Sequence, residues 1–321
     1  MFESYKDTLV AVTGGTGFVG SHFVAALKEA GARVRVIRHN RAMPFSIQGL
    51  EYVDADLCNA AEALKALQGA QFVFHAAGAV SAAGVTTTNP TSAITENLVL
   101  TARVLEAAGI AKVERCLIFS SGTTAYPLVD HPITEDEMWD EPPPEVYFGY
   151  GWMRRYLELL GKFTMDRSGI NVAICRPTAV YGRHDNFDLK TCHVVPALIR
   201  RAISGETPFE VWGTGDEMRD FLHVTDLVRG CMLLLEKKAD CDPVNIGYGS
   251  TSTVGDIARI VMKAVGRSVD EIVFNPDRPT TIPKRLVNTD KAKELLGFEP
   301  TITLEDGLID VVNWYREAYD S

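Results

Sequence analysis

Thr13-Gly14-Gly15-Thr16-Gly17-Phe18-Val19-Gly20 is the stretch that decides the fold of this 321-residue chain. It follows a short β-branched run at 8–12 and precedes a helical pattern that extends to Ala30. Glycines at every third position permit a tight turn, close approach of a pyrophosphate and packing of the helix on the strand. Although a plain glycine turn is the alternative, the strand–loop–helix context favours dinucleotide binding. The expected cofactor contacts here are Gly14, Thr16, Gly17, Phe18, Val19 and Gly20.

Further β-branched runs at 33–37, 71–75, 116–120 and 171–175 alternate with helical patterns. This alternation predicts an α/β fold, a Rossmann-type doubly wound parallel sheet. The rhythm weakens after Tyr181-Gly182, where we expect a smaller, discontinuous substrate-binding lobe to begin. We therefore predict an NADP-binding domain at 1–180, with 216–246 returning to it, and a lobe formed by 181–215 and 247–321.

The end of the second predicted strand indicates which dinucleotide binds. An NAD-binding protein usually has an acidic residue there, about 20 residues after the glycine loop. This chain has Arg38-His39-Asn40-Arg41 instead, and the two guanidiniums suit a 2′-phosphate. Solvated loop charges are the alternative interpretation. We expect NADP, with NAD possible, and Asp56 could accept a hydrogen bond from the adenine amine.

Composition excludes several classes of function. Hydrophobic residues make up 46% and charged residues 23%, which is typical of a globular protein with a sizeable core. The net charge of −10 disfavours nucleic acid and anionic membranes as partners. The six cysteines are scattered and show no metal-ligand spacing, and no apolar run is long enough to span a membrane. We expect a cytoplasmic protein without a metal site.

Later motifs resemble the extended short-chain dehydrogenase/reductase family of nucleotide-sugar epimerases, dehydratases and reductases. They are His75-Ala76-Ala77-Gly78, Ser120-Ser121-Gly122-Thr123-Thr124-Ala125-Tyr126, a helical Tyr150, and Arg176-Pro177 ahead of Tyr181-Gly182. The resemblance runs nearly end to end and implies further cofactor contacts. These are Leu57, Ala76, Ala77, Gly78, Ser120, Tyr150, Arg154, Pro177 and Val180.

The second half resembles the GDP-fucose synthase branch of that family, at 181–187, 193–201, 211–215 and 218–224. That branch epimerises and then reduces a GDP-linked 4-keto-6-deoxyhexose with NADPH. The implied substrate contacts are Asn186, His193, Val194, Arg201, Trp212, Arg219 and Arg278. Arginines of this kind can pair a diphosphate, and an indole can stack on a base.

The family's catalytic unit is a Ser or Thr, a Tyr, and a Lys four residues after the Tyr. Tyr150 matches the tyrosine, but Arg154 stands at the lysine position. The i, i+4 spacing puts both on one helix face, so the cation can still favour a phenolate, whereas proton relay through an ammonium is in question. Gly122 occupies the Ser position and offers no hydroxyl. A neighbouring hydroxyl could serve instead, in the order Thr124, Thr123, Ser121.

Epimerisation beside a ketone needs a base on one face and an acid on the other. The resemblance puts Thr124 where the family branch has its cysteine base, and matches His193 to the branch histidine; a structural loop histidine is the alternative. We therefore expect an NADPH-dependent reductase of a 4-keto-6-deoxy nucleotide sugar, with hydride delivered to C4 and Tyr150 as acid. The alternatives are an epimerase or dehydratase with tightly held NAD, and an NADP-binding sensor or scaffold that has lost its chemistry.

Assembly is the last expectation. The predicted helices at 91–108 and 150–165 carry more apolar residues than one sheet face needs. In the family that the chain resembles, such a pair forms a four-helix interface between two subunits. We therefore expect a homodimer.

Overall fold

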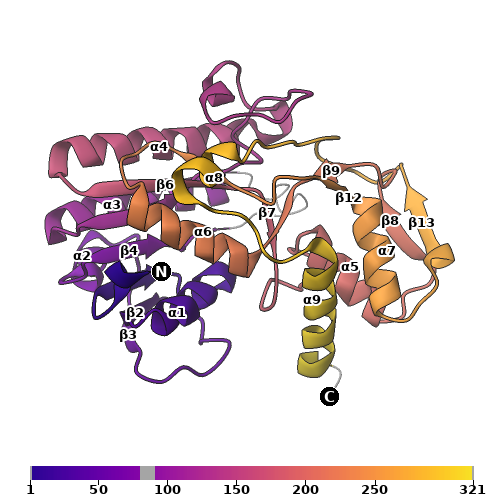
Figure 1. Cartoon of the computed structure of the whole chain (residues 1–321), viewed down its shortest axis with the longest axis horizontal. Coiled ribbons are helices and arrows are strands. Elements are labelled where there is room, and N and C mark those ends of the chain that lie inside the picture. The colour runs from indigo at the N-terminus through magenta and orange to yellow at the C-terminus, as the bar shows by residue number, and fades with distance from the viewer. Residues whose placement is uncertain (1, 80–90, 320–321) are drawn as a thin grey trace.

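The larger part of the molecule is built on a seven-stranded parallel sheet, with a second lobe beside it (Figure 1). The computed structural model describes residues 2–79 and 91–319. The strand order is β11-β6-β5-β4-β1-β2-β3, which confirms the predicted doubly wound sheet. The strands are β1 (Leu9–Thr13), β2 (Arg33–Arg38), β3 (Glu51–Asp54), β4 (Phe72–His75), β5 (Arg115–Phe119), β6 (Asn171–Pro177) and β11 (Val244–Ile246).

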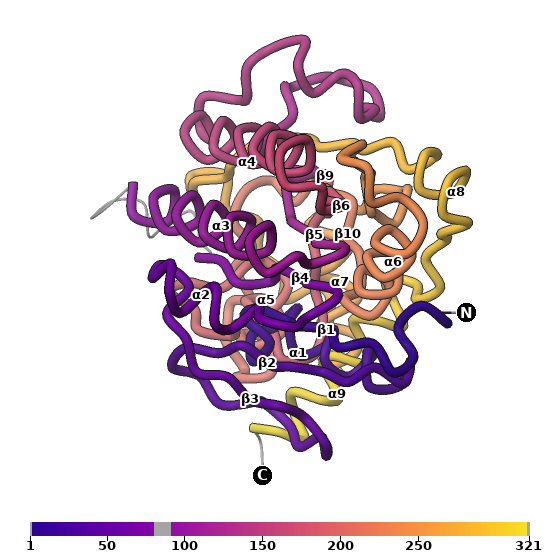
Figure 2. Tube along the Cα trace, turned by 90° about the vertical axis from the view of Figure 1, so that its left-hand side faces the viewer, coloured from indigo at the N-terminus to yellow at the C-terminus, as the bar shows by residue number. Residues whose placement is uncertain are grey.

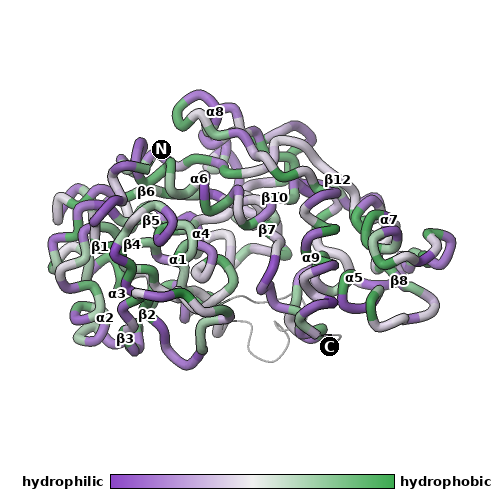
Figure 3. The backbone as a smooth tube through the Cα atoms, turned by 60° about the horizontal axis from the view of Figure 1, so that its bottom comes forward, coloured by the Kyte–Doolittle hydropathy of each residue, from purple (hydrophilic) through white to green (hydrophobic). Residues whose placement is uncertain are grey.

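Helices cover both faces of this sheet. One face carries α1 (Phe18–Glu29) and α6 (Val224–Lys237), and the other carries α2 (Ala60–Leu67), α3 (Ser92–Ala111) and α4 (Phe148–Ser168) (Figure 2). Because both faces are buried, the inner strands are almost continuously apolar rather than alternating, as the green stretches of β1, β4, β5 and β6 show (Figure 3).

A second, smaller lobe packs around its own core. It contains α5 (Val194–Ile203), α7 (Val254–Ala264) and α9 (Leu304–Tyr319), with β8 (Phe209–Trp212) paired in parallel to β13 (Ile272–Asn275). By contrast, α8 (Asp290–Leu296), which lies within the predicted lobe range 247–321, packs against α6 and β11 of the sheet. Two short ladders join the parts: β7 (Ala179–Tyr181) with β10 (Phe221–His223), and β9 (Met218–Arg219) with β12 (Ser252–Thr253).

Short 3₁₀ helices complete the fold, at Glu3–Tyr5, Asp136–Trp139, Glu145–Tyr147 and Val269–Glu271. None of the helices described is long and apolar enough to cross a membrane. The carboxyl ends of β1, β4, β5 and β6 meet at one edge of the sheet, next to the second lobe (Figure 1). In parallel α/β sheets, this edge is where ligands bind.

Candidate active site

The glycine loop forms a cradle too tight for side chains. Gly14 has φ +60°, and a Cβ there would lie 2.7 Å from Ala77 Cα. A Cβ on Gly20 would lie 2.1 Å from the Gly14 carbonyl oxygen. Gly17 is the N-cap of α1, and its N–H donates to the Gly14 carbonyl at 2.8 Å. The first turn of α1 therefore begins where a pyrophosphate would meet free N–H groups.

Other expected cofactor residues surround this cradle. Ala77 N donates to Thr13 Oγ1 at 3.2 Å, which joins the ends of β1 and β4. Ser120, at the end of β5, has a buried Oγ without a hydrogen-bond partner among the residues that the structure describes. A tight cradle and an unpartnered buried hydroxyl fit a dinucleotide bound along this edge.

The remaining predicted contacts lie on neighbouring strand ends. Ala76 and Gly78 flank Ala77, Leu57 is buried beside the exposed Asp56, Val180 pairs with Leu222 in the β7–β10 ladder, and the Pro177 carbonyl accepts from Gly122 N at 2.9 Å.

The two arginines after β2 have different surroundings. Arg38 faces Asp54 across the β2–β3 register and donates to Asp54 Oδ1 at 2.7 Å. This hydrogen bond raises the pKa of Arg38 and lowers that of Asp54. Arg41, three residues further on, is exposed at the start of the loop that leads to β3. A 2′-phosphate would therefore compete with Asp54 for Arg38 but would meet Arg41 directly.

Tyr150 and Arg154 lie together on the first turns of α4. Arg154 Nη2 donates to Tyr150 Oη at 2.6 Å, and Nη1 donates to the Phe119 carbonyl at the end of β5 at 3.0 Å. The guanidinium also lies 5.0 Å from the centroid of the Tyr150 ring. The i, i+4 pair predicted from the sequence thus becomes a charge-assisted hydrogen bond.

The hydroxyls near Gly122 do different things. Ser121 Oγ accepts from the backbone N–H groups of Thr123 and Thr124, at 3.2 and 3.0 Å, and so stabilises the turn. Thr124 Oγ1 is buried and has no partner among the described residues. Its backbone touches α4, because a Cβ on Gly151 would lie 2.5 Å from the Thr124 carbonyl oxygen. Thr124 therefore offers a buried, unpartnered hydroxyl and lies against the Tyr150 helix.

Gly122 itself has no room for a side chain. A Cβ there would lie 2.8 Å from the Pro177 carbonyl oxygen. A serine at this position would require the 121–126 turn or β6 to shift.

His193 is the N-cap of α5, immediately before Val194. His193 is solvent-exposed, and partial desolvation by the surrounding protein lowers the pKa of its ring. Asn186 lies in the preceding loop and donates from Nδ2 to Thr191 Oγ1 at 2.8 Å, so it helps to order that loop.

Arg201, Trp212 and Arg278 lie on the second lobe. Arg201 is committed to its neighbours, since it pairs with Glu206 at 2.7 and 2.5 Å. Trp212 is half-exposed at the end of β8, and the Arg278 guanidinium lies 5.4 Å from its ring centroid. The exposed indole face remains available to stack on a base, whereas the guanidinium of Arg201 already has a carboxylate partner.

Arg219 has a neighbour that the sequence analysis missed. Arg285 is 3% exposed and donates to the Tyr126 and Pro127 carbonyls at 3.0 and 2.5 Å. Burial and Arg219 lower its pKa to about 10. Arg219 donates to the Met218 and Ile282 carbonyls and to the Thr281 hydroxyl. Two arginines hydrogen-bonded to neutral oxygens form a local positive site suited to a diphosphate.

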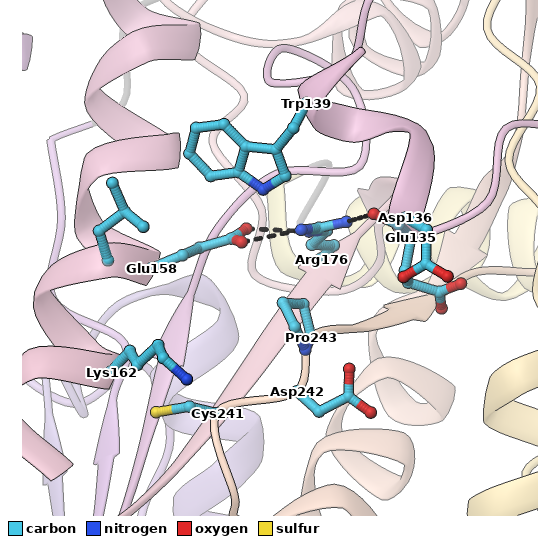
Figure 4. A pocket seen from close by; sticks show the side chains of 10 residues that line it. Glu135, Asp136, Trp139, Glu158, Lys162, Arg176, Cys241, Asp242 and Pro243 are labelled. Carbon is cyan, nitrogen blue, oxygen red and sulfur yellow. Dashed lines mark hydrogen bonds and ion pairs between the residues drawn. The ribbon is translucent and has the colours of Figure 1, made fainter. Parts of the chain in front are cut away.

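A buried polar network supports the 121–126 turn from behind. Arg176 pairs with Glu158 at 2.9 and 2.8 Å and donates to Tyr126 Oη at 2.9 Å. Figure 4 shows this pair beside a cavity of about 200 Å³. None of the predicted catalytic, cofactor or substrate residues lines that cavity. Every guanidinium nitrogen of Arg176, which lines the cavity, already has a hydrogen-bond partner in the protein. We therefore assign this ion pair to the stability of the turn rather than to ligand binding.

Metal-ligating side chains do not cluster in the part of the chain that the structure describes. No three His, Cys, Asp or Glu residues there are arranged to hold a metal ion.

Comparisons with known proteins agree with this architecture. The family described as "NAD dependent epimerase/dehydratase family" matches residues 10–247. GDP-L-fucose synthase 1 of Arabidopsis thaliana is 30% identical and covers 97% of this chain and 94% of its own. The dTDP-4-dehydro-6-deoxy-D-allose reductase of Streptomyces bikiniensis is 28% identical and covers 98% of each chain. The structure of UDP-glucose 4-epimerase from Thermotoga maritima has a TM-score of 0.87 at 26% identity, and covers 97% of this chain and 99% of its own.

Proposed function

The chain belongs to the NAD dependent epimerase/dehydratase family, and from this premise we propose that it is an NADPH-dependent reductase of a 4-keto-6-deoxy nucleotide sugar. Its similarity to a GDP-L-fucose synthase and to a dTDP-linked sugar reductase supports a keto-sugar substrate in two nucleotide series. We favour the GDP-linked sugar because the motifs around His193, Trp212 and Arg219 resemble that branch.

The hydrogen bond between Arg154 and Tyr150 carries this proposal. Bound NADPH would supply the hydride. Tyr150 donates its phenolic proton to the oxygen that forms at C4, and Arg154 stabilises the phenolate left behind. Thr124 Oγ1, which is buried and unpartnered, orients the same substrate oxygen by a hydrogen bond.

The cofactor lies along the carboxyl edge of the sheet in this proposal. The glycine cradle holds the pyrophosphate at the N-terminus of α1. Arg41 binds the 2′-phosphate, and Arg38 joins it once Asp54 is displaced. On the substrate side, Arg219 holds the diphosphate, the charge of the buried Arg285 adds to the positive field there, and the exposed face of Trp212 bounds the base.

The epimerase half remains a narrower proposal. Partial burial lowers the pKa of His193, which favours the uncharged imidazole that a general base requires. Thr124 stands where the family branch has a thiol, and a threonine hydroxyl, unlike a thiol, does not ionise near neutral pH to supply a base. We therefore expect reduction without efficient epimerisation.

One experiment tests the function directly. The protein is incubated with NADPH and a panel of GDP-, dTDP- and UDP-linked 4-keto-6-deoxy sugars, while nicotinamide absorbance and product mass are followed. We expect oxidation of NADPH with one nucleotide series. The product should be about two mass units heavier than the substrate, because it gains one hydride and one proton. No oxidation with any keto-sugar would favour the sensor or scaffold alternative, for which Arg154 and Gly122 at the usual Lys and Ser positions are the supporting observations.

A second alternative uses no external reductant. An epimerase or dehydratase with tightly held NAD would carry its cofactor through gel filtration, whereas a reductase must release it after each turnover. Mass spectrometry of any dinucleotide that denaturation releases from the purified protein separates the two.

We also propose a homodimer in the cytoplasm. The solvent face of α4 carries Phe148, Trp152, Tyr156, Leu159 and Phe163, which are all 40 to 58% exposed. An apolar stripe of this length along one helix is typical of a subunit interface. The free cysteines support a reducing compartment.

A further inference from the structure

The ring of His184 connects three parts of the chain that are distant in sequence. Its centroid lies 4.9 Å from Phe45, 4.7 Å from Trp314 and 6.0 Å from His22. Phe45 belongs to the β2–β3 loop (residues 39–50), Trp314 to α9 of the second lobe, and His22 to α1. No residue of this cluster has been given a role in the proposed function.

The backbone conformation of His184 and the uncharged state of its ring both favour these aromatic contacts. It has φ +64°, an uncommon conformation for a residue other than glycine, which turns the chain sharply after β7. Burial, His22 and Arg183 lower its pKa to about 4, so the ring is uncharged at neutral pH. An uncharged ring packs between aromatic neighbours without the desolvation penalty of an imidazolium.

The β2–β3 loop is held at two points, one of which is the contact with His184. Lys28 Nζ donates to the Gly49 carbonyl at 3.3 Å, which anchors the end near β3. Phe45 packs on His184 and anchors the middle of the loop. Arg41 lies four residues before Phe45 and is exposed, so the path of the loop decides where its guanidinium points.

We propose that His184 is a positioning residue for cofactor discrimination: by holding Phe45, it fixes the β2–β3 loop so that Arg41 faces the 2′-phosphate of NADP. This inference rests on the proposed preference for NADPH. The position of Arg41 should affect the affinity for NADPH alone, because NADH lacks the 2′-phosphate that Arg41 would bind. The contact with Trp314 ties the same ring to the second lobe and keeps it in place.

Binding of NADPH and NADH to the metal-free, substrate-free protein tests the inference by calorimetry. Phe45→Ala and His184→Ala should raise the Kd for NADPH about five- to fiftyfold and leave that for NADH within about twofold. His184→Phe keeps an uncharged ring and should restore most of the NADPH affinity. Phe187→Ala is the matched control, since Phe187 packs on Trp314 and Tyr315 from the lobe side without appearing among the ring contacts of Phe45.

The outcomes separate this inference from the proposal beneath it. If the unmodified protein prefers NADPH but Phe45→Ala changes both affinities equally, or neither, His184 does not position the loop. Phe45 is partly exposed, so this variant retains the core and gives an answer even if His184→Ala fails to fold. Equal affinity of the unmodified protein for NADPH and NADH would overturn the proposed cofactor preference itself, and this inference with it.

Discussion

Arg154 Nη2 donates a 2.6 Å hydrogen bond to Tyr150 Oη, while the other end of the same guanidinium donates to the Phe119 carbonyl at the end of β5. The cation therefore spans the distance from the strand to the phenol. A lysine ammonium is a single point and has no planar fork to reach both oxygens in this way. The site is built around the guanidinium rather than merely tolerating it.

This geometry predicts the kinetics of three variants. Tyr150→Phe should lower single-turnover NADPH oxidation about a hundredfold or more, because it removes the proton donor. Arg154→Lys keeps the charge but leaves one acceptor unpaired, so we expect a loss of up to about tenfold. Arg154→Met should approach the Tyr150→Phe value. The rate is measured with the best keto-sugar, and an Arg154→Met variant as fast as the native protein would contradict the mechanism.

Cofactor choice should respond to the residue opposite Arg38. Asp54→Asn removes the carboxylate that now occupies Arg38, and we expect NADPH to bind about three- to tenfold more tightly. Arg38→Asp should weaken NADPH and spare NADH. Both are read by fluorescence titration, with Glu51→Gln as control, because Glu51 pairs with Arg35 on the same two strands. Weaker NADPH binding by Asp54→Asn would mean that the phosphate does not reach Arg38.

Some of this site followed from the sequence, and the reasons are local. The glycine loop and the alternation of strands and helices are patterns of residues close together in the sequence. They could therefore predict the parallel sheet without any tertiary information. The Tyr150–Arg154 contact follows from helical spacing alone. The opposition of Arg38 and Asp54 instead requires the register of β2 against β3, which no local pattern specifies.

Tertiary contacts account for what the sequence did not indicate. Arg285 comes near Arg219 because the chain after β13 returns alongside β9, where Arg285 N donates to the Met218 carbonyl at 3.0 Å. The resemblance to the GDP-fucose synthase branch implied that Arg201 contacts the substrate. Its pairing with Glu206, five residues later, depends on how the chain turns after α5.

The exposed stripe of α4 predicts the oligomeric state. The unmodified protein should scatter light as a species of about twice its 35.2 kDa chain mass. Phe163→Asp buries a charge in the proposed interface and should give monomers at micromolar concentration. Leu295→Asp, on the exposed part of α8, should remain dimeric. A native protein that scatters light as a monomer would contradict the proposed interface on α4.

Stability should fall on acidification, and His75 explains part of the loss. Its ring is buried between the Thr13 and Thr101 hydroxyls, at 2.8 and 3.1 Å, and burial lowers its pKa to about 3. The unfolded chain takes up this proton near pH 6.5 and the folded one does not, so the stabilisation is complete above that range and falls as pH decreases towards 3.

The contribution of His75 to the free energy of unfolding therefore falls by about 2 kcal/mol between neutral pH and about pH 5. His75→Gln cannot take up the proton and should flatten the pH dependence of the free energy of unfolding by that amount, measured in urea. His39→Gln, at an exposed position, is the control. An unchanged slope in His75→Gln would show that this ring takes up its proton over the same pH range in the folded and the unfolded chain.

The diphosphate site gives the sharpest contrast between two arginines. Arg219 donates to neutral oxygens beside Arg285, whereas Arg201 already pairs with a carboxylate. Arg219→Gln should therefore weaken binding of the preferred nucleoside diphosphate about ten- to hundredfold, and Arg201→Gln only about threefold or less.

Titrations with GDP, UDP and dTDP, each compared with its monophosphate, measure the contribution of the second phosphate to the binding affinity. Arg219→Gln should reduce the preference for the diphosphate, because the lost charge acts on that group. If Arg201→Gln is the more damaging variant, Glu206 must release Arg201 when substrate binds, and the site proposed for the diphosphate moves to α5.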